Sequence, residues 1–491
     1  MSVAAPSRRA ETLAYGLIVL VTLWRLALLA FDPPNLSFDE AQYWAWAQTL
    51  QLGYYSKPPL VAWVIAATTA MFGDGEGAVK LGSALAHLGT ALVLVSLGRR
   101  LFGGSAGAWA GAAWISLPAV SLSSLVITTD PFLLLAWAAA LLFLVEAERA
   151  GPGPNRWWVL LGLAFGIGLL AKYAMAFFVL SLAVWLAWDR EARRLLRGGG
   201  PWLALGLGLL VYAPNGLWNA ANGFVSYAHT RDNANLGGSL FHPDKLAEFV
   251  LGQAAVFGPI LIAVLAAALV PAFRAGADRR VRLLAAFALP VLAVMTAESL
   301  LSRANANWTA PAYVAATLLV SAWLAARAPR LAALSVALHL AAAGLVVNLD
   351  ALRPVLGLPD SARWDIEKRI KGWDEVGRQV SAILAAHPGA RLLADERKVL
   401  ATLTYYVRPH PFDAVKWNPT GAVRDHFDQT TRLEAGAAET IFVTEDSLLP
   451  GDLPRRFATV EKLADIHVPI HADYARDLTV WRLAGFKGYD R

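Results

Sequence analysis

Side chains that could do chemistry lie mainly at the ends of long apolar runs. Asp39 and Glu40 offer carboxylates, and a carboxylate can take the proton of a hydroxyl that would otherwise be a poor nucleophile. Lys57, Lys172 and Arg303 offer cations, which hold anions such as phosphate through charge-assisted hydrogen bonds. The full set of such positions is Asp39, Glu40, Lys57, Asp130, Lys172, Asn215, Asn219, His229, His242 and Arg303.

The composition around these residues is that of an integral membrane protein. Hydrophobic residues make up 57% of the 491 residues and charged residues only 16%, against roughly 25% charged in an ordinary soluble domain. This excludes a soluble protein of this length and a disordered or collagen-like chain. The net charge of +6 arises in short loops between apolar runs, so it indicates membrane orientation and not nucleic-acid binding. The absence of cysteine excludes disulfides and thiolate chemistry.

Apolar runs of about bilayer length recur up to residue 349 and predict about eleven membrane spans. The first run is too long for a signal-peptide core and lacks a small-residue cleavage site, so we expect an uncleaved span. The predicted spans are residues 13–31, 77–98, 105–121, 131–147, 157–171, 173–188, 202–219, 249–273, 283–300, 309–326 and 331–349.

Arginines collect in alternate loops, for example at Arg99 and Arg100 and again at Arg193 and Arg194. Because basic loops stay in the cytoplasm, this pattern predicts a cytoplasmic N-terminus and, with an odd number of spans, an external C-terminus. The external segments are then residues 32–76, 220–248 and 301–308 and the tail from 350. All the candidate positions named above fall on that external side.

Two of these external segments have a predicted internal structure. Residues 38–50 place apolar side chains three and four positions apart, which indicates a helix lying in the membrane interface, and residues 59–72 are short enough to be a second one. After residue 349 helical patterns at 372–386 and 396–406 alternate with β-rich runs at 440–444 and 478–483. We therefore expect a membrane domain over residues 1–349 and a small external α/β domain over 350–491.

Basic residues on the external side need a reason to be there, since they depart from the positive-inside pattern. A bound anion would supply that reason for Lys57, Lys172 and Arg303. Lys172 has an alternative, because a lysine at a short turn between spans can extend its amine to the interface. Arg25 lies well inside the first predicted span, so it should point into the bundle and pair with a carboxylate or a ligand anion.

The acids have structural alternatives as well. Ser37 and Glu40 have the spacing of a capping box, and Asp39 would lie in the first helical turn, where the helix dipole favours a carboxylate. Asp130 precedes a proline and could be a helix N-cap. His229 and His242 are not at metal-ligand spacing, so we expect surface histidines and no metal ligand set.

The chain resembles the polyprenyl-phosphate-sugar-dependent glycosyltransferases of the GT-C superfamily, glycosyltransferase family 39, which includes protein O-mannosyltransferases and the lipid A aminoarabinose transferase. The most specific match is FDEAQYWAWAQTLQLGYYSKPPLVAW at residues 38–63, which is similar to the first external loop of these enzymes. Supporting matches, in order, are TTDPFLLLAW (128–137), GLLAKYAM (168–175), YAPNGLWNAANGF (212–224), GQAAVFGPI (252–260) and ANWTAPAY (306–313).

This resemblance implies a mostly α polytopic bundle of the GT-C type, with about 11–13 spans, and roles for individual residues. Asp39, Glu40 and Asp130 match acidic positions that such enzymes place at the active site, and Lys57 matches the basic residue associated with the lipid phosphate. The implied donor-phosphate set is Lys57, Lys172, Arg303 and Arg25, and the substrate-binding set is Tyr43, Tyr54, Tyr55, Asn215, Asn219, His229, Asn307 and Trp308.

One position departs from the family. The aminoarabinose transferases are expected to carry an acidic residue just before the matched lysine, whereas this chain has Ser56 before Lys57. Ser56 in place of an acidic residue weighs against aminoarabinose as the transferred sugar and against a metal site at this position. No cofactor is expected, because fixed cations can oppose a monophosphate leaving group, and the sequence leaves a divalent metal open.

The residues and the resemblance together predict an inverting transferase in which Asp39 is the base. An acceptor hydroxyl would attack the anomeric carbon of a sugar on a polyprenyl phosphate, through a transition state like that of glycoside hydrolysis. The expected acceptor is a periplasmic glycolipid such as lipid A or lipopolysaccharide core, with a secreted protein as the alternative. The expected place is the inner membrane, with the active site and C-terminus in the periplasm.

Two other classes of protein fit the membrane spans less well. A flippase or transporter of lipid-linked sugars would be expected to show internal repeats and broken mid-membrane helices, and neither stands out in the sequence. A ligase that takes glycans from a lipid diphosphate would be expected to have an arginine-rich external site.

Overall fold

The computed structural model describes residues 8–233, 240–436 and 439–489, which form two compact units. The first, the helical unit, comprises Met1–Phe31, Lys57–Val64 and Lys80–Val346. The second, the α/β unit, comprises Asp32–Ser56, Ile65–Val79 and Val347–Arg491. The first external segment predicted from the sequence thus folds largely with the C-terminal residues, a grouping that the expected division at residue 349 did not contain.

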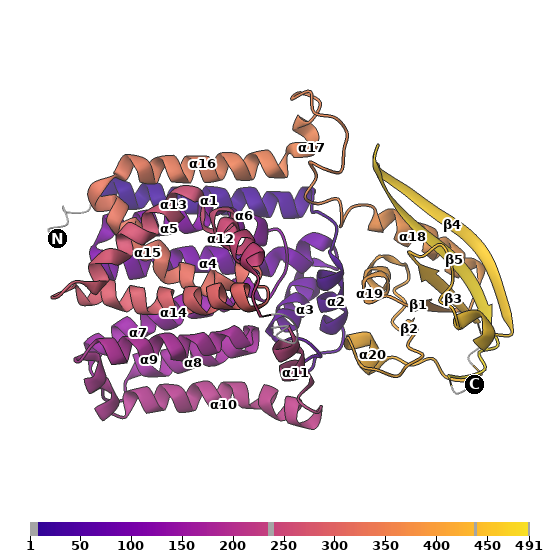
Figure 1. The fold of residues 1–491 in the computed structure, drawn as a ribbon, viewed down its shortest axis with the longest axis horizontal. Helices are drawn as coiled ribbons and strands as arrows, with labels where there is room; N and C mark the ends of the chain where they lie inside the picture. Colours follow the sequence, from indigo (N-terminus) through magenta and orange to yellow (C-terminus); the bar gives the residue numbers. More distant parts are fainter. Residues whose placement is uncertain (1–7, 234–239, 437–438, 490–491) are drawn as a thin grey trace. The chain divides into compact units, whose positions relative to one another are not determined.

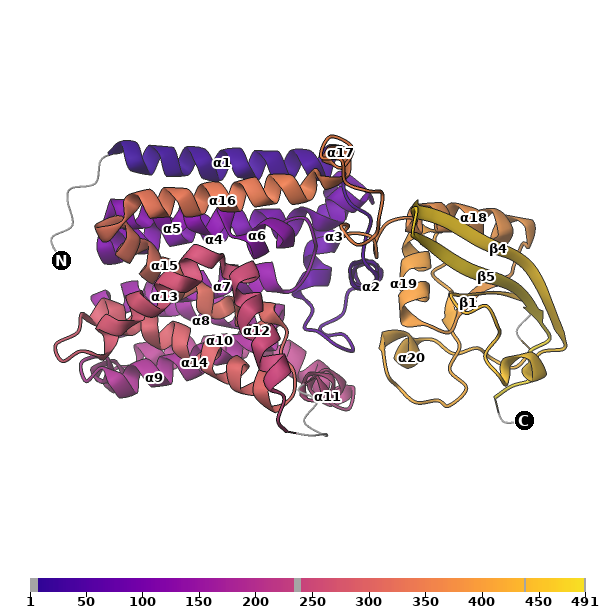
Figure 2. The same ribbon diagram turned by 45° about the horizontal axis from the view of Figure 1, so that its top comes forward.

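Long apolar helices run side by side in the helical unit (Figures 1 and 2). The helices of this unit, long and short, are α1 (Arg8–Phe31), α4 (Glu76–Phe102), α5 (Gly104–Ser116), α6 (Pro118–Ser123), α7 (Asp130–Ala150), α8 (Arg156–Ala171), α9 (Phe177–Trp188), α10 (Gly200–Ala221), α11 (Val225–Asp232), α12 (Pro243–Phe257), α13 (Pro259–Leu269), α14 (Arg279–Leu301), α15 (Ala310–Arg327) and α16 (Pro329–Val347). Short 3₁₀ turns are η1 (Tyr173–Ala176), η2 (Ala192–Arg197), η3 (Val270–Phe273) and η4 (Ala306–Thr309). Helix α3 (Leu60–Phe72) contributes its two halves to different units.

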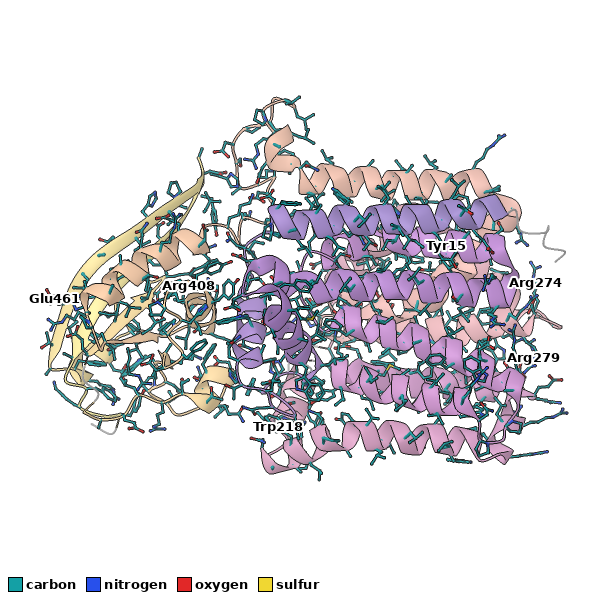
Figure 3. All side chains as sticks on the ribbon, turned by 180° about the vertical axis from the view of Figure 1, so that it is seen from behind. Tyr15, Trp218, Arg274, Arg279, Arg408 and Glu461 are labelled. Atoms are coloured by element: carbon teal, nitrogen blue, oxygen red, sulfur yellow. The ribbon has the colours of Figure 1, made fainter. Side chains whose placement is uncertain are left out.

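These helices make the chain a multi-pass membrane protein. Within the described residues six helices are long and apolar enough to cross a bilayer, or seven if the bent pair α12 and α13 counts as one span. Shorter apolar helices cover residues 60–72, 156–171 and 173–188. Figure 3 shows Arg279 at one end of the helical unit and Trp218 at the other, so charged and aromatic side chains mark its two ends. The total of about eleven spans stays a prediction.

Two predicted spans are wrong as single straight helices. The run at 249–273 bends by 103° between α12 and α13, because Gly258 has a positive φ of 91° and Pro259 starts a new helix. A side chain at Gly258 would also meet the His339 ring, at 2.0 Å from Nε2. The run at 105–121 ends as a helix at Ser116, because Leu117 precedes Pro118 and takes an extended backbone.

The α/β unit contains one five-stranded sheet with strand order β2-β1-β3-β5-β4. Its strands are β1 (Arg391–Ala394), β2 (Val415–Lys416), β3 (Glu439–Thr444), β4 (Thr459–His471) and β5 (Tyr474–Ala484). Its helices are α2 (Phe38–Ala47), α17 (Leu349–Leu352), α18 (Trp373–Ala386), α19 (Arg397–Tyr406) and α20 (His426–Thr430), with the 3₁₀ turn η5 (Leu453–Arg456). The predicted helices at 372–386 and 396–406 and the predicted strands at 440–444 and 478–483 are confirmed.

Strand β1 lies parallel to β2 and β3, and β5 lies antiparallel to β3 and β4. In this register Phe442 faces Trp481. The core on one side of the sheet is aromatic and aliphatic, with Leu393, Phe442 and Leu483 fully buried. Since β3 is buried along almost its whole length, it reads as a continuous apolar run and not as an alternating one.

Helix α2 packs on α19 inside the α/β unit. The Trp44 ring meets the edge of Tyr405 at a centroid distance of 5.0 Å, and the backbone N–H of Leu36 donates to the Tyr406 hydroxyl at 2.7 Å. Trp44 Nε1 donates to a carboxylate oxygen of Asp74 at 2.5 Å. These buried contacts fix α2, and with it Asp39, on the C-terminal part of the chain.

Candidate active site

Asp130, Lys172 and Asn307 come together in the helical unit. Lys172 Nζ lies 2.6 Å from Asp130 Oδ1, and Asn307 Nδ2 donates to Asp130 Oδ2 at 3.2 Å. The three residues belong to the start of α7, the extended residue after α8, and η4. Both oxygens of Asp130 are therefore occupied, and the ammonium of Lys172 keeps two further N–H donors.

The expectation that Asp130 is an N-cap is wrong. The N-cap of α7 is Thr129, whose side chain makes no capping bond, and Asp130 is already the first helical residue. Asp130 turns instead to Lys172, because a charged partner forms a stronger hydrogen bond than a backbone amide. Lys172 likewise does more than extend its amine to the interface, since it pairs with a carboxylate.

A cavity of about 290 Å³ adjoins this cluster. Asp130, Asn307 and Thr128 line it with polar atoms, together with Ser123 and Tyr313. The rest of its wall is mostly apolar and includes Trp114, Leu117, Val120 and Leu134. A few polar groups in a largely apolar cavity suit a ligand that is part lipid and part sugar or phosphate.

Buried amides hold the chain reversal that carries Lys172. Asn215 and Asn219 on α10 are fully buried. The Tyr173 hydroxyl donates to Asn215 Oδ1 at 3.2 Å and accepts from Asn219 Nδ2 at 3.2 Å. Because Tyr173 follows Lys172 directly, this network positions the lysine. Tyr173 lies in the matched motif at residues 168–175, but the motif did not predict the hydrogen-bond partners of Tyr173.

A second network holds the turn that carries Asn307 and Trp308. The Gln253 side chain accepts hydrogen bonds from the Thr309 hydroxyl at 2.8 Å and from the Tyr313 hydroxyl at 2.6 Å. The same side chain is 94% buried, on α12. Gln253 was not among the predicted residues, although its motif was recognised, because a single glutamine in an apolar run carries no chemical signal of its own.

Arg25 is buried as expected but has no acidic partner within the described residues. Its Nη2 donates to the Ile115 carbonyl at 2.6 Å and to the Ser121 hydroxyl at 3.0 Å. The expected pairing with a carboxylate is wrong, because the break between α5 and α6 leaves backbone carbonyls that a guanidinium can satisfy. Pairing of Arg25 with a ligand anion stays a prediction. Its Nε and Nη1 have no hydrogen-bond partner within the described residues.

The remaining predicted cations differ in their surroundings. Lys57 is half-buried just before Pro58. Arg303 is exposed and forms no ion pair within the described part of the helical unit. His229 lies on α11 and His242 at the start of α12, and among the described residues no group of three His, Cys, Asp or Glu side chains could hold a metal ion.

Asp39 in the α/β unit is held by an arginine that the sequence did not point to. Arg397 Nη1 lies 2.9 Å from Asp39 Oδ1 and donates to Gln42 Oε1 at 3.2 Å. Its guanidinium also lies over the Phe38 ring, 4.6 Å from the centroid. The second oxygen of Asp39 has no partner within the described part of the α/β unit. Because 358 positions separate the two residues, no local pattern could have found the pair.

Glu40, next to Asp39, completes the capping box predicted from Ser37. The Ser37 hydroxyl accepts from the Glu40 backbone N–H at 3.4 Å, and the Glu40 carboxylate accepts from the Ser37 backbone N–H at 2.8 Å. The Glu40 side chain is buried. These contacts favour the structural alternative for Glu40, and Asp39 is the more accessible carboxylate of the two.

The tyrosines of the same segment are all buried. The Tyr54 hydroxyl donates to the Trp46 carbonyl at 3.0 Å and accepts from the Gln51 backbone N–H at 3.1 Å. Its ring stacks on Trp46 at 4.5 Å, and burial raises the pKa of Tyr54 to about 12. Tyr54 therefore braces the segment, whereas Tyr43 and Tyr55 are buried beside it.

Comparison with solved structures identifies the fold. The structure is similar to that of ArnT from Cupriavidus metallidurans in the apo state, with a TM-score of 0.59, 16% identity and coverage of 96% of this chain and 98% of the other. It is equally similar, at a TM-score of 0.59 and 18% identity over 96% and 97% of the two chains, to ArnT bound to undecaprenyl phosphate. The chain therefore shares the fold of ArnT over nearly its whole length.

Comparison of sequences identifies the family. The chain is 33% identical over 436 residues, 88% of its length and 90% of the other, to the lipid A galacturonosyltransferase RgtD of Rhizobium johnstonii. Over 41% of its length it is 29% identical to an undecaprenyl phosphate-alpha-4-amino-4-deoxy-L-arabinose arabinosyl transferase of Erwinia tasmaniensis, covering 38% of that protein. A family model described as dolichyl-phosphate-mannose-protein mannosyltransferase matches residues 56–218. The chain belongs to the GT-C glycosyltransferases, the family of this galacturonosyltransferase.

Proposed function

We propose that this protein transfers one galacturonic acid residue from a polyprenyl-phosphate donor to a hydroxyl group of lipid A. The similarity to a lipid A galacturonosyltransferase along 88% of the chain supports this sugar and this acceptor. The similarity to an aminoarabinose transferase covers only 41% of the chain, and Ser56 departs from the acidic residue expected of that group. The proposed location is the inner membrane, with the reacting groups on the periplasmic side.

The different hydrogen bonding of the two carboxylates carries the assignment of roles. Asp130 has both oxygens occupied, by Lys172 and by Asn307. Asp39 has one oxygen held by Arg397 and one oxygen without a partner within the described α/β unit. Asp39 is therefore the proposed base, and Asp130 the residue that fixes Lys172 and Asn307.

In the proposed reaction the acceptor oxygen forms a bond to the anomeric carbon while the bond from that carbon to the phosphate oxygen breaks. The hydroxyl proton passes to Asp39, and the bonding electrons leave with the lipid monophosphate. Lys172, with two N–H donors free of Asp130, opposes the charge that grows on the phosphate, and Lys57 is proposed to assist. A single displacement inverts the anomeric centre.

Arg303 has a separate proposed role. A uronic acid carries a carboxylate that a neutral sugar lacks, so its recognition needs a cation that is not already neutralised. Arg303 is exposed and without an ion pair in the described helical unit, and it lies four residues before Asn307 on the same segment. We assign it to the sugar carboxylate.

The test is transfer by the purified full-length protein with a polyprenyl-phosphate-linked galacturonic acid and lipid A. Mass spectrometry should show lipid A gaining one hexuronic acid, and NMR should show the opposite anomeric configuration to that of the donor. The Asp39→Asn variant should bind the donor but not turn over. Transfer to a protein acceptor and none to lipid A would replace the proposed acceptor, and full turnover by Asp39→Asn would remove the base.

A further inference from the structure

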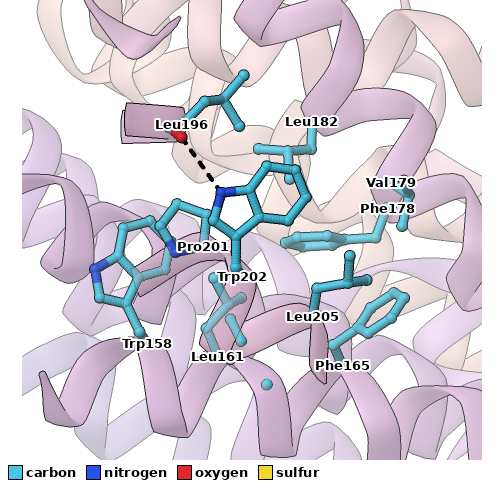
Figure 4. A pocket seen from close by; sticks show the side chains of 12 residues that line it. Trp158, Leu161, Phe165, Phe178, Val179, Leu182, Leu196, Pro201, Trp202 and Leu205 are labelled. Atoms are coloured by element: carbon cyan, nitrogen blue, oxygen red, sulfur yellow. Dashed lines mark hydrogen bonds between the residues drawn. The ribbon is translucent and has the colours of Figure 1, made fainter. Parts of the chain in front are cut away.

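An apolar cavity of about 160 Å³ opens between α8, α9 and α10. Trp158 and Phe165 line it from α8, Phe178 and Leu182 from α9, and Trp202 from α10, as Figure 4 shows. Trp202 is 59% exposed, and the lining residues Val179 and Leu205 are also well exposed, so the cavity opens on the outer surface of the helical unit. An apolar cavity that opens toward the bilayer suits a hydrocarbon chain.

The segment that closes one end of the cavity is held in a fixed position. Leu196 of η2 lines the cavity, and its carbonyl accepts a hydrogen bond from Trp202 Nε1 at 3.3 Å (Figure 4). The backbone N–H of Gly200 donates to the Pro152 carbonyl at 2.9 Å. A side chain at Gly198 would lie 2.2 Å from that same carbonyl oxygen, so only glycine allows this close approach. The segment is thus seated on the loop before α8.

The same segment carries four arginines without acidic partners. Arg190, Arg193, Arg194 and Arg197 are exposed, and none of them forms an ion pair within the described residues. The two acids of this loop pair with a residue from elsewhere, because Arg279 of α14 lies 2.6 Å from Asp189 and 2.9 Å from Glu191, and it also pairs with Glu148 at 2.8 Å. Arg279 lies at the arginine-rich end of the helical unit (Figure 3).

We propose that this cavity and its arginines form a binding site for an anionic glycerophospholipid. One acyl chain lies in the cavity, and the headgroup phosphate is held by Arg193, Arg194 and Arg197. Arg197 follows Leu196 directly and Arg194 lies two residues before it, so the cations and the apolar wall belong to one short piece of chain. Basic sites between membrane helices on the cytoplasmic side are suited to anionic headgroups, and the positive-inside pattern places this loop there.

The site is separate from the proposed transferase chemistry. None of the residues lining this cavity lines the cavity of Asp130 and Asn307. The inference therefore holds or fails independently of the proposed sugar and acceptor, and its test is a binding measurement.

The experiment uses the purified full-length protein in detergent micelles, titrated with phosphatidylglycerol or with phosphatidylcholine of the same acyl chains, and counts bound lipids by native mass spectrometry. The first variant is the triple substitution Arg193→Gln, Arg194→Gln and Arg197→Gln. Its matched control removes the same charge from exposed arginines of other loops, as Arg99→Gln, Arg274→Gln and Arg330→Gln. The second variant, Leu205→Trp, fills the cavity and keeps every arginine.

The wild type should prefer phosphatidylglycerol, and the triple variant should bind it roughly 100-fold more weakly, from three arginines at the usual strength of a basic residue near an anionic headgroup. The control should bind as the wild type does, and Leu205→Trp should lose the tightly bound lipid. Equal binding of the two lipids by the wild type, or equal loss in the control, would overturn the proposal. The proposal would also be overturned if polyprenyl phosphate co-purified with the wild type and the control but not with the triple variant. If the triple variant does not fold, the binding of phosphatidylglycerol by Arg194→Gln and Leu205→Trp tests the proposal instead.

Discussion

Replacing Arg397 with alanine should distinguish the contribution of this residue to the stability of the α/β unit from its contribution to catalysis. Arg397 and Asp39 have side chains 31% and 47% exposed, so solvent screens their attraction. A pair of this kind contributes about 0.2–1 kcal/mol to stability. The contact with the Phe38 ring, at 4.6 Å, adds about 0.5–1 kcal/mol. The free energy of unfolding should therefore fall by only ~1–2 kcal/mol.

The expected effect on turnover is larger. Asp39 is the proposed base, and Arg397 and the Gln42 side chain fix where its carboxylate lies. A displacement of about 1 Å in a reacting group costs on the order of 100-fold in rate. We expect kcat and kcat/KM of Arg397→Ala to fall together by ~10–100-fold, because the lost interaction acts in the transition state and not in substrate binding.

The assay is steady-state transfer to lipid A, measured beside the thermal midpoint of each variant. Arg397→Lys should recover part of kcat, since an ammonium can pair with Asp39 but cannot lie flat over the Phe38 ring as the planar guanidinium does. Arg378→Ala is the matched control, because Arg378 pairs with Glu375 on α18 with its side chain 72% exposed. The reasoning is refuted if Arg397→Ala keeps wild-type kcat, or if its loss of activity only follows the fraction of unfolded protein.

Three further predictions concern other residues. Lys172→Met should lower kcat and kcat/KM for the lipid-phosphate donor at least tenfold, because it removes the cation that opposes the charge growing on the phosphate. Donor titrations would detect this, and an unchanged kcat would take Lys172 out of that role. Arg303→Ala should raise KM for a uronic acid donor about tenfold but leave a neutral-sugar donor unaffected, which competition kinetics with both donors would resolve. Burial lowers the pKa of His426 from 6.5 to about 4. As the pH falls from 6.5 toward 4, His426 binds a proton in the unfolded chain but not in the folded chain, so the free energy of unfolding decreases across that pH range. After a discount for partial exposure the loss is ~2 kcal/mol. The thermal midpoint of the wild type should thus fall more between pH 7 and pH 5 than that of His426→Phe, and parallel falls would contradict this.

Local patterns in the sequence predicted much of the fold. The membrane class followed from apolar runs of bilayer length, and the capping box of α2 followed from Ser37 and Glu40 at the required spacing. The α/β character of the tail followed from residues 440–444 and 478–483, which are strands in the structure. Strand β4 was missed because its charged and apolar residues mix, as in a strand with one face toward solvent.

The helix breaks were harder to place. Gly258 and Pro259 lie inside a run that is apolar enough to be taken for one span. The 103° bend is seen only in the folded chain, where the backbone at Gly258 lies against the His339 ring. Arg25 shows the same limit. Its burial could be inferred from the cost of an arginine facing lipid, but its partners are a carbonyl and a hydroxyl exposed by a break in another helix.

The residue types at the ends of the spans, and so the kind of chemistry available to this glycosyltransferase, follow from the amino-acid sequence. How these residues pair depends on the way the chain folds. Lys172 occupies one oxygen of Asp130 and Asn307 the other, and Arg397 holds a single oxygen of Asp39. Spacing along a helix reaches three or four residues, whereas these partners are 42, 177 and 358 positions apart. Such pairs are set by how helices and strands pack, because packing brings distant segments within the reach of a hydrogen bond.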